Sequence, residues 1–248
     1  MFTPRPVPVA LAGTLIVALV GCTGADGDGG AADKPAAATV AVLSPDTASA
    51  AAATIAGPAP SSSNAESAAP ESSTRKQTAL LAIPSIGVVN LRVVPYEGTT
   101  DDWAGTRIQD RGVAASPYGD EGGVGPGEVG NYLVTAHRLS AGGPLRELPS
   151  VDEGDSVFVT AGGKVHEYKI TDSRMTSFRS ERSLAEQRAA VPGSPGKRPT
   201  KAMITLSTCA TPEDDAAGNF WRDEKGNPEH RIDKIGVLTS SRAAPSDK

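Results

Sequence analysis

The sequence predicts a mainly β protein that folds as a closed antiparallel or mixed barrel. After about residue 77, short runs rich in β-branched residues recur, and turns rich in glycine or proline separate them. Only residues 181–190 show a convincing helical pattern. Many short strands with few helices favour a barrel over a doubly wound α/β fold.

The expected strands are apolar or alternating runs bounded by turn residues. In chain order they are Leu80–Ile83, Val88–Val94, Asn131–Ala136, Ser156–Thr160, Val165–Ile170, Met203–Thr208 and Ile232–Leu238. Gly162 and Gly163 predict a tight hairpin between the fourth and fifth of these strands. Ser180 is the expected N-cap of the helix over 181–190, and Pro192 lies just past its end.

The first third of the chain has a different character. No aromatic residue lies between Phe2 and Tyr96, and residues 23–76 are mostly Ala, Ser, Pro, Gly and Thr. Such a segment cannot bury enough apolar surface to offset its ordering entropy, so we expect a disordered tether over 23–76. We expect the folded catalytic domain over 77–241 and a short tail over 242–248.

The N-terminus has the features of a targeting segment. Arg5 precedes the apolar stretch Val7–Gly21, which is shorter than the about 20 residues of a membrane span and suits a secretory leader. Leu19-Val20-Gly21-Cys22 resembles a bacterial lipobox, so residues 1–22 are expected to be a lipoprotein-type signal peptide lipidated at Cys22. The alternative is a plain signal-anchor helix. Either reading places the domain at the extracytoplasmic face of the cell membrane.

Composition excludes several other classes of function. The net charge of −5, with no block of basic residues, argues against nucleic acid as a partner. The three histidines lie far apart and no acidic pair has ligand-like spacing, so no metal site is expected. The glycine-rich segment 122–127 contains Pro126 and leads into no helix, which indicates a surface loop and not a phosphate cradle. No cofactor is expected.

Cys209 is the strongest candidate for a catalytic residue. The β-prone run Ile204–Cys209 stops on this cysteine, and the polar residues 210–214 follow as a turn. Lipidation would consume Cys22, the other cysteine of the chain, and would leave Cys209 as an unpaired thiol outside the cytoplasm. A thiol at the end of a strand is placed to act as a nucleophile. The alternative is an inert, buried cysteine that packs as a small hydrophobe.

A histidine could supply acid–base chemistry to this thiol. His137 ends a predicted strand beside a loop, where an imidazole can exchange protons with a cleft. His166 lies within a predicted hairpin as a surface or partly buried residue, and His230 stands ambiguously at the start of the last strand.

An arginine could complete the site. Arg231 opens the last predicted strand, and pairing of that strand with 203–208 would place Arg231 beside Cys209. A guanidinium there could stabilise an oxyanion and favour the thiolate. Arg138 and Arg222 are rival candidates.

Together these motifs resemble those of sortases, the cysteine transpeptidases of Gram-positive cell surfaces. Thr205–Cys209 matches the TLxTC signature, Thr135-Ala136-His137 matches the strand-end histidine, and Arg231 matches the arginine of the last strand. The segment Ile83–Val88 resembles the opening strand motif of the family. The chain most resembles class E and related actinobacterial sortases. The resemblance implies a sortase-type closed β-barrel of about eight strands with one or two short helices.

The resemblance also implies a reaction. Cys209 would attack the Thr–Gly bond of an LPxTG- or LAxTG-like sorting signal, His137 would move protons, and Arg231 would hold the oxyanion or the substrate backbone. The expected partners are secreted proteins with a C-terminal sorting signal and an amine of a peptidoglycan precursor or a pilin. The alternatives are a lipid-anchored cysteine peptidase and a non-catalytic binding lipoprotein on the same barrel. The segments 101–130 and Pro212–Pro228 are candidates for lids over the cleft.

Overall fold

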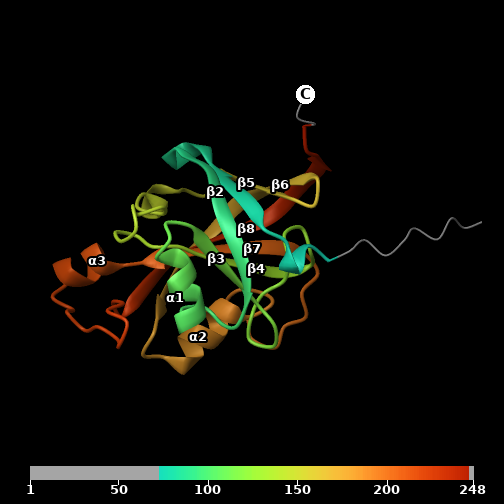
Figure 1. Cartoon of the computed structure of the whole chain (residues 1–248). Coiled ribbons are helices and arrows are strands. Elements are labelled where there is room, and N and C mark those ends of the chain that lie inside the picture. The colour runs from blue at the N-terminus through green and yellow to red at the C-terminus, as the bar shows by residue number, and fades with distance from the viewer. Residues whose placement is uncertain (1–72, 246–248) are drawn as a thin grey trace, which may run out of the picture. The chain divides into compact units, whose positions relative to one another are not determined.

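Eight strands close a barrel in the part of the chain that the computed structural model describes, residues 73–245. Around the barrel the strands follow the order β1-β2-β3-β4-β7-β8-β6-β5 (Figure 1). Their bounds are β1 Ala79–Ile83, β2 Val88–Glu97, β3 Ala114–Tyr118, β4 Gly130–Thr135, β5 Ser156–Ala161, β6 Lys164–Ser177, β7 Ala202–Cys209 and β8 His230–Ala243. Two neighbouring pairs, β2–β3 and β4–β7, are parallel and the others are antiparallel. The predicted mainly β, closed barrel is therefore confirmed.

Strand β3 was not predicted. Its sequence, Ala-Ala-Ser-Pro-Tyr, lacks the β-branched residues that mark a strand and contains a proline. It forms because residues 93–97 of β2 offer a complete parallel partner for its whole length. Its pairing with β4 is recorded at Ala115 and Thr135, before Pro117, so the missing proline N–H interrupts no bond to β4.

The hairpin between β5 and β6 confirms the prediction from the two glycines. Ala161 pairs with Lys164 across the turn, which leaves two residues in the loop. Gly162 and Gly163 both have positive φ, +55° and +71°. This is the conformation that two-residue hairpin turns require, and glycine adopts it without strain.

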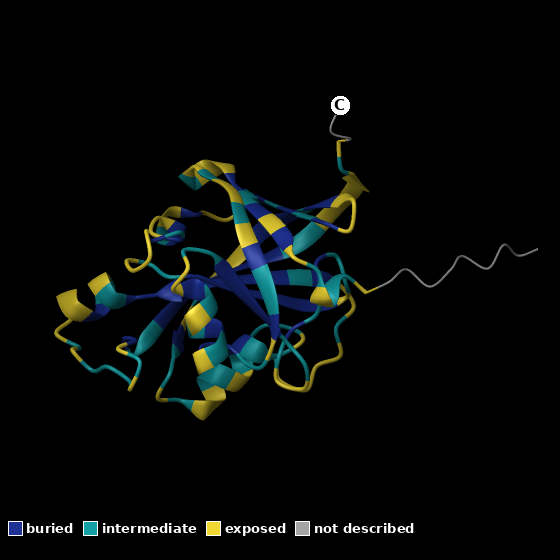
Figure 2. Ribbon diagram, viewed as in Figure 1, coloured by how far each residue is buried: buried dark blue, intermediate teal, exposed yellow. Residues whose placement is uncertain are grey.

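The core fills the barrel interior with aliphatic side chains and tyrosines. Figure 2 shows buried residues running along the central parts of the strands. Tyr168, Leu81, Ile83, Leu133 and Ile204 are among the largest side chains that are fully buried. Burial of each such side chain contributes about 1.5–3 kcal/mol to stability.

Within residues 73–245, three α-helices and three short 3-10 turns lie around the barrel. Their bounds are α1 Trp103–Gln109, α2 Glu181–Arg188, α3 Thr211–Ala216, η1 Thr74–Lys76, η2 Pro84–Ile86 and η3 Leu148–Ser150. Helix α2 confirms the predicted helix, and its N-cap Ser180 accepts a hydrogen bond from Ser183 N at 3.2 Å. Helices α1 and α3 were not predicted.

The unpredicted helices are short and poor in helix signals. Gly105 and Thr106 lower the intrinsic helix propensity of α1, which depends on its cap. The carboxylate of Asp102 caps this helix by accepting from Gly105 N at 2.7 Å. Helix α3 has Pro212 in its first turn, a position where the missing N–H costs nothing.

The predicted leader over 1–22, its lipidation at Cys22 and the tether as far as residue 72 lie outside the described residues. Residues 74–76, which fall in the predicted tether, form η1 against the domain, and Glu128 accepts from Thr74 N at 2.9 Å. At the other end, β8 continues through Ala243, past the predicted domain end at 241. Between residues 73 and 245 no helix has the length and apolar character needed to cross a membrane.

Gly127 offers a test of the packing at the end of the barrel. Its φ is +80°, and an added Cβ would lie 2.3 Å from the ring of the buried His166. We expect Gly127→Ala to lower the free energy of unfolding by about 2–4 kcal/mol, because left-handed backbone strain and overpacking both act. Urea denaturation measures the loss. Gly142→Ala is the matched control, since φ there is +87° and the space is open, so only the strain of about 1 kcal/mol remains. Equal losses in the two variants would contradict the packing argument.

Candidate active site

Cys209 ends β7 between the ends of two neighbouring strands. Strand β7 runs parallel to β4 through the pair Thr135 and Ser207, and Ala136 N continues the ladder by donating to Ser207 O at 3.2 Å. The hydroxyl of Thr208 donates to Ala136 O at 2.8 Å. The register therefore brings His137, the next residue after β4, alongside Cys209.

Arg231 flanks Cys209 on the other side. The two residues are paired in the antiparallel register of β7 and β8, as the sequence predicted. Nη1 of Arg231 donates a hydrogen bond to Cys209 Sγ, and the guanidinium lies over the Phe178 ring, 4.5 Å from its centroid. Both Cys209 and Arg231 are buried, with 8% and 3% of their surface exposed. The three candidates thus come from the adjacent ends of β4, β7 and β8.

The two rival arginines bind elsewhere. Arg138 makes two hydrogen bonds of 3.1 Å to the carboxylate of Glu213 on α3, and it also donates to the carbonyl oxygen of Cys209 at 3.3 Å. Arg222 binds the Asp215 carboxylate and the carbonyl oxygen of Trp221. These contacts fix the segment after Cys209, whereas the contact with the sulfur belongs to Arg231.

Asp101 completes a chain of buried polar groups that the sequence analysis missed. Its carboxylate accepts a hydrogen bond from Nη2 of Arg231, and the pair is almost fully buried. The backbone of Asp101 has a φ of +64°, in the left-handed region. Asp102, the cap of α1, fixes this turn from the next position. One guanidinium therefore bridges the thiol and a carboxylate of the segment before α1.

Asn227 approaches the sulfur from the loop between α3 and β8. Its Oδ1 lies 4.0 Å from Cys209 Sγ. Its Nδ2 donates to the carboxylate of Asp223 at 2.9 Å, which fixes which end of the amide faces the sulfur. The Asp223 carboxylate also accepts from the backbone N–H of Asn227 and of Lys225. An acceptor oxygen held in this way favours the protonated thiol.

The charges around the sulfur oppose one another. Burial raises the pKa of the Cys209 thiol above its usual value, Arg231 acts to lower it, and Asp101 and Asp223 act to raise it. Burial also raises the pKa of Asp101, although Arg231 opposes that effect. In this arrangement the net result favours the neutral thiol.

His137 is held by a carboxylate at the C-terminal end of α1. Its Nε2 lies 2.9 Å from Oδ1 of Asp110, the C-cap of this helix. The His137 side chain is 13% exposed and that of Asp110 is 58% exposed, so the pair stands at the edge of the site. Asp101 and Asp110 flank α1 at its two ends, so one short helix positions groups on both Arg231 and His137.

The other histidines have structural contacts. His166 is buried, deeper than the sequence analysis expected, and its Nδ1 lies 2.9 Å from Ser241 Oγ. His230 binds the carboxylate of Asp214 through Nδ1 at 2.7 Å and thereby ties β8 to α3. Within residues 73–245 no group of three or more histidine, cysteine or acidic side chains could hold a metal ion.

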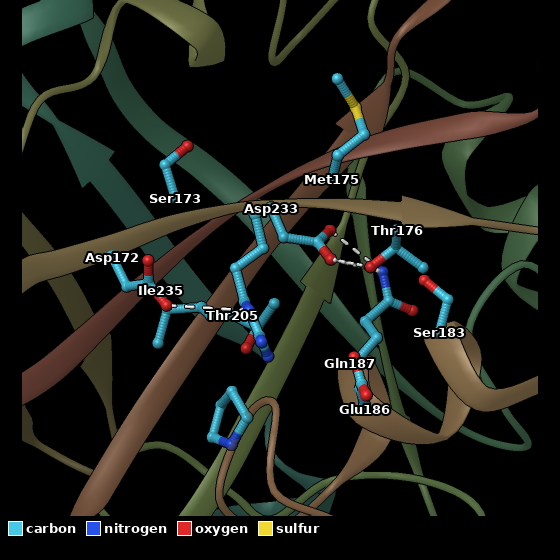
Figure 3. Close-up of a pocket in the computed structure, with 12 residues that line it drawn as sticks. Asp172, Ser173, Met175, Thr176, Ser183, Glu186, Gln187, Thr205, Asp233 and Ile235 are labelled. Atoms are coloured by element: carbon cyan, nitrogen blue, oxygen red, sulfur yellow. Dashed lines mark hydrogen bonds and ion pairs between the residues drawn. The ribbon is translucent and has the colours of Figure 1, made fainter.

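A polar cavity of about 330 Å³ lies on the same side of the sheet as the sulfur. Thr205 and Asp233 both line this cavity. Thr205 lies four residues before Cys209 and Asp233 two residues after Arg231, so strand alternation puts each on the same face as its partner in the site. Figure 3 shows Asp233 hydrogen-bonded to Thr176 and Gln187, with α2 forming the opposite wall. The face of β7 and β8 that carries the thiol therefore continues into a hollow beneath α2.

The sequence offered no signal for Asp101, Asp110 or Asn227. Each reaches the site from a loop or a helix end that pattern analysis cannot place. Asp101 and Asp110 lie in the candidate lid segment 101–130, and Asn227 lies in the candidate lid Pro212–Pro228.

Replacement of Asp101 tests the charge balance at the sulfur. Asp101→Asn keeps an oxygen that accepts from Arg231 but removes one negative charge that raises the Cys209 pKa. We expect the pH midpoint of thiol alkylation by iodoacetamide to fall, although burial still keeps it above that of a free cysteine. Asp102→Asn is the matched control, because the neighbouring carboxylate caps α1 and does not act on the sulfur. An unchanged midpoint in Asp101→Asn would refute this account.

The comparisons with known proteins agree with the fold. A family model for the sortase domain matches residues 81–220, which include His137 and Cys209. Sortase SrtE1 of Streptomyces coelicolor is 30% identical over 139 residues, which cover 54% of this chain and 36% of that protein. The match thus spans about a third of the length of this curated relative.

Two solved sortase structures are similar to this chain. The SrtA sortase from Actinomyces oris is 21% identical, with a TM-score of 0.51 over 67% of this chain and 82% of that chain. Sortase E1 from Streptomyces coelicolor, solved with a tripeptide in its active site, is 23% identical over 69% of this chain and 93% of that chain, with a TM-score of 0.49. The likeness to the Actinomyces structure shows a common fold. The family model matches more than half of the residues of this chain, so the chain belongs to the sortase family of cysteine transpeptidases.

Proposed function

We propose that this chain is a transpeptidase that cleaves a Thr–Gly bond in an LPxTG- or LAxTG-like sorting signal and transfers the acyl group to an amine. The observation that carries the proposal is the contact of Arg231 with Cys209 Sγ, made where His137 stands at the end of the adjacent strand. An inert structural cysteine requires neither a buried guanidinium nor a neighbouring imidazole.

Acylation would proceed in two steps. The Cys209 thiolate attacks the threonine carbonyl carbon, and the resulting oxyanion receives hydrogen bonds from the guanidinium of Arg231. The C–N bond then breaks as the imidazolium of His137 gives its proton to the departing glycine amine. The product is a thioester on Cys209 and a neutral His137.

In the transfer step, His137 acts as a base instead of an acid. An acceptor amine attacks the thioester carbonyl carbon, and neutral His137 takes the proton that the amine loses. The C–S bond breaks, the thiolate of Cys209 is released, and a new amide bond joins the acyl group to the acceptor. His137 is then protonated again for the next cycle.

The arrangement predicts a modest rate at neutral pH. Because burial raises the pKa of Cys209, only a small fraction of the enzyme carries the thiolate before substrate binds. The rate of acylation should therefore rise with pH as the fraction of Cys209 thiolate increases.

Substitutions at the three candidates test the assignment. With a fluorogenic sorting peptide and a glycine amine, we expect Arg231→Ala to lower kcat/KM about 10²–10³-fold and His137→Ala about 10²–10⁴-fold. Cys209→Ala should give no acyl adduct in the intact mass spectrum. The matched control is Arg222→Ala, which removes a rival arginine and should leave the rate almost unchanged. An acyl adduct that persists in Cys209→Ala would exclude the thioester, and hydrolysis without aminolysis would identify a peptidase instead.

We also propose that the domain works at the extracytoplasmic face of the membrane, anchored by a lipid on Cys22. The lipobox-like segment 19–22 supports this proposal. Cys22→Ala should abolish metabolic labelling with a palmitate analogue. The variant should also retain the uncleaved leader, because lipidation precedes cleavage in lipoprotein-type signal peptides. Labelling that survives the substitution would rule out Cys22 as the lipid site.

A further inference from the structure

The two ring nitrogens of His137 have different surroundings. Nε2 lies 2.9 Å from Oδ1 of Asp110, the residue that ends α1. Nδ1 has no hydrogen-bond partner among the side chains and backbone groups of residues 73–245. A neutral imidazole takes up a proton on only one of its two nitrogens, so this difference bears on the acid–base step.

The chemistry of the carboxylate decides which nitrogen carries the proton in neutral His137. An ionised carboxylate accepts hydrogen bonds and donates none, so the nitrogen that faces Asp110 must be the donor. Nε2 is therefore protonated, and Nδ1 holds the lone pair. The hydrogen bond made by one nitrogen in this way fixes the role of the other.

The main chain holds both partners of this pair in place. Gly112, two residues after Asp110, has a φ of +75°, and a Cβ added there would lie 3.1 Å from the carbonyl oxygen of Ala141. The end of α1 is thus packed against the loop that follows β4. In the same loop, Leu145 N donates to the carbonyl oxygen of His137 at 3.2 Å. Backbone contacts therefore set the separation between the carboxylate and the ring.

The stability of α1 does not explain a carboxylate at position 110. The C-terminal end of a helix carries partial negative charge, so an acidic side chain there is unfavourable. The cap bonds of Asp110 are made by its backbone N–H, and within residues 73–245 its side chain binds His137 alone. A residue that opposes the stability of its own helix and contacts only the imidazole is typical of a functional position.

We propose that Asp110 is a positioning residue, which holds neutral His137 in the Nε2–H tautomer and makes Nδ1 the nitrogen that moves protons. The inference rests on the proposed transpeptidation and names the atom of its acid–base step. In acylation, the imidazolium gives its Nδ1 proton to the departing amine while Nε2–H stays bonded to Asp110. In transfer, the lone pair of Nδ1 takes the proton that the attacking amine loses, and the carboxylate remains ionised throughout.

Nitrogen NMR of the ring tests the tautomer without any catalysis. The protein is labelled with isotope-enriched histidine, the signals of His137 are assigned by their loss in His137→Gln, and spectra are recorded at a pH where the ring is neutral. We expect Nε2 to show the shift of a protonated nitrogen and Nδ1 that of an unprotonated one. In Asp110→Ala both shifts should move toward intermediate values, because the two tautomers then exchange. A protonated Nδ1 in the wild-type protein, or shifts that Asp110→Ala leaves unchanged, would overturn the proposal.

Rate measurements then connect the tautomer to the reaction. In Asp110→Asn we expect kcat with the sorting peptide to fall about tenfold while KM stays unchanged, because an amide can also donate and so permits the wrong tautomer. Asp110→Glu, which restores an acceptor-only partner, should recover part of the loss. The matched control is Asp152→Asn, since this exposed carboxylate in the turn before β5 has no side-chain partner within residues 73–245. Its kcat should equal that of the wild-type protein.

Thermal unfolding separates positioning from a structural role. Because the charge of Asp110 opposes the dipole of α1, the melting temperature of Asp110→Asn should stay within about 2 °C of the wild-type value or rise. A fall in rate that accompanies a clear fall in melting temperature, with no recovery in Asp110→Glu, would overturn the proposal. Absence of any acyl-enzyme in the wild-type protein would count against the proposed function, and the NMR measurement would still decide whether Asp110 fixes the tautomer.

Discussion

The buried guanidinium of Arg231 is the constraint on which the site depends. It is almost fully enclosed, and a charge in that position is tolerated only when hydrogen-bonded partners surround it. Those partners are a thiol from β7 and a carboxylate from the segment before α1, so three parts of the chain must meet at one point. Loss of one partner from such a pair costs about 3–5 kcal/mol, which links the order of this segment to the geometry of the sulfur. The site and the local fold are therefore stabilised by the same contacts.

A second polar centre joins the helix α2 to the barrel. The side-chain amide of Gln187 donates to both oxygens of Asp233 and to Ser207 Oγ, and its oxygen accepts from Thr100 Oγ1 at 3.1 Å. Its backbone carbonyl accepts from Asn131 Nδ2 at 3.0 Å. Burial raises the pKa of Asp233, and hydrogen bonds from Ser207, Thr176 and Gln187 act to lower it. Because Thr100 directly precedes Asp101, its hydrogen bond to Gln187 connects α2 to the segment whose carboxylate binds Arg231. Hydrogen bonds therefore link α2, which walls the cavity of Figure 3, to the residue that precedes Asp101.

Sequence reasoning reached the parts of the site that follow from strand alternation. The pairing of Cys209 with Arg231 was predictable because both residues lie in strands with a strong apolar pattern. These strands, β7 and β8, follow each other in the chain. Strand β3 escaped because Ala-Ala-Ser-Pro-Tyr has no strand signal of its own and depends on β2. The roles of Asp101 and Asn227 were not predicted for a related reason. Both residues lie in turns, and the position of a turn depends on the strands and helices that it connects. The burial of His166 likewise depends on packing against Gly127, which no local pattern reveals.

In the proposed reaction, the burial of Cys209 would favour transfer over hydrolysis. Cys209 has 8% of its residue surface exposed, and burial raises the pKa of its thiol, which lowers the fraction of thiolate. The same enclosure would hinder access of water to the proposed thioester, since Arg231 contacts the sulfur and Asn227 Oδ1 lies 4.0 Å from it. In the proposed reaction, a bound acceptor would be held beside His137 at high effective concentration, an advantage that free water lacks. In the proposed reaction, slow activation and selective transfer would both follow from one physical property, the burial of Cys209 at the end of β7.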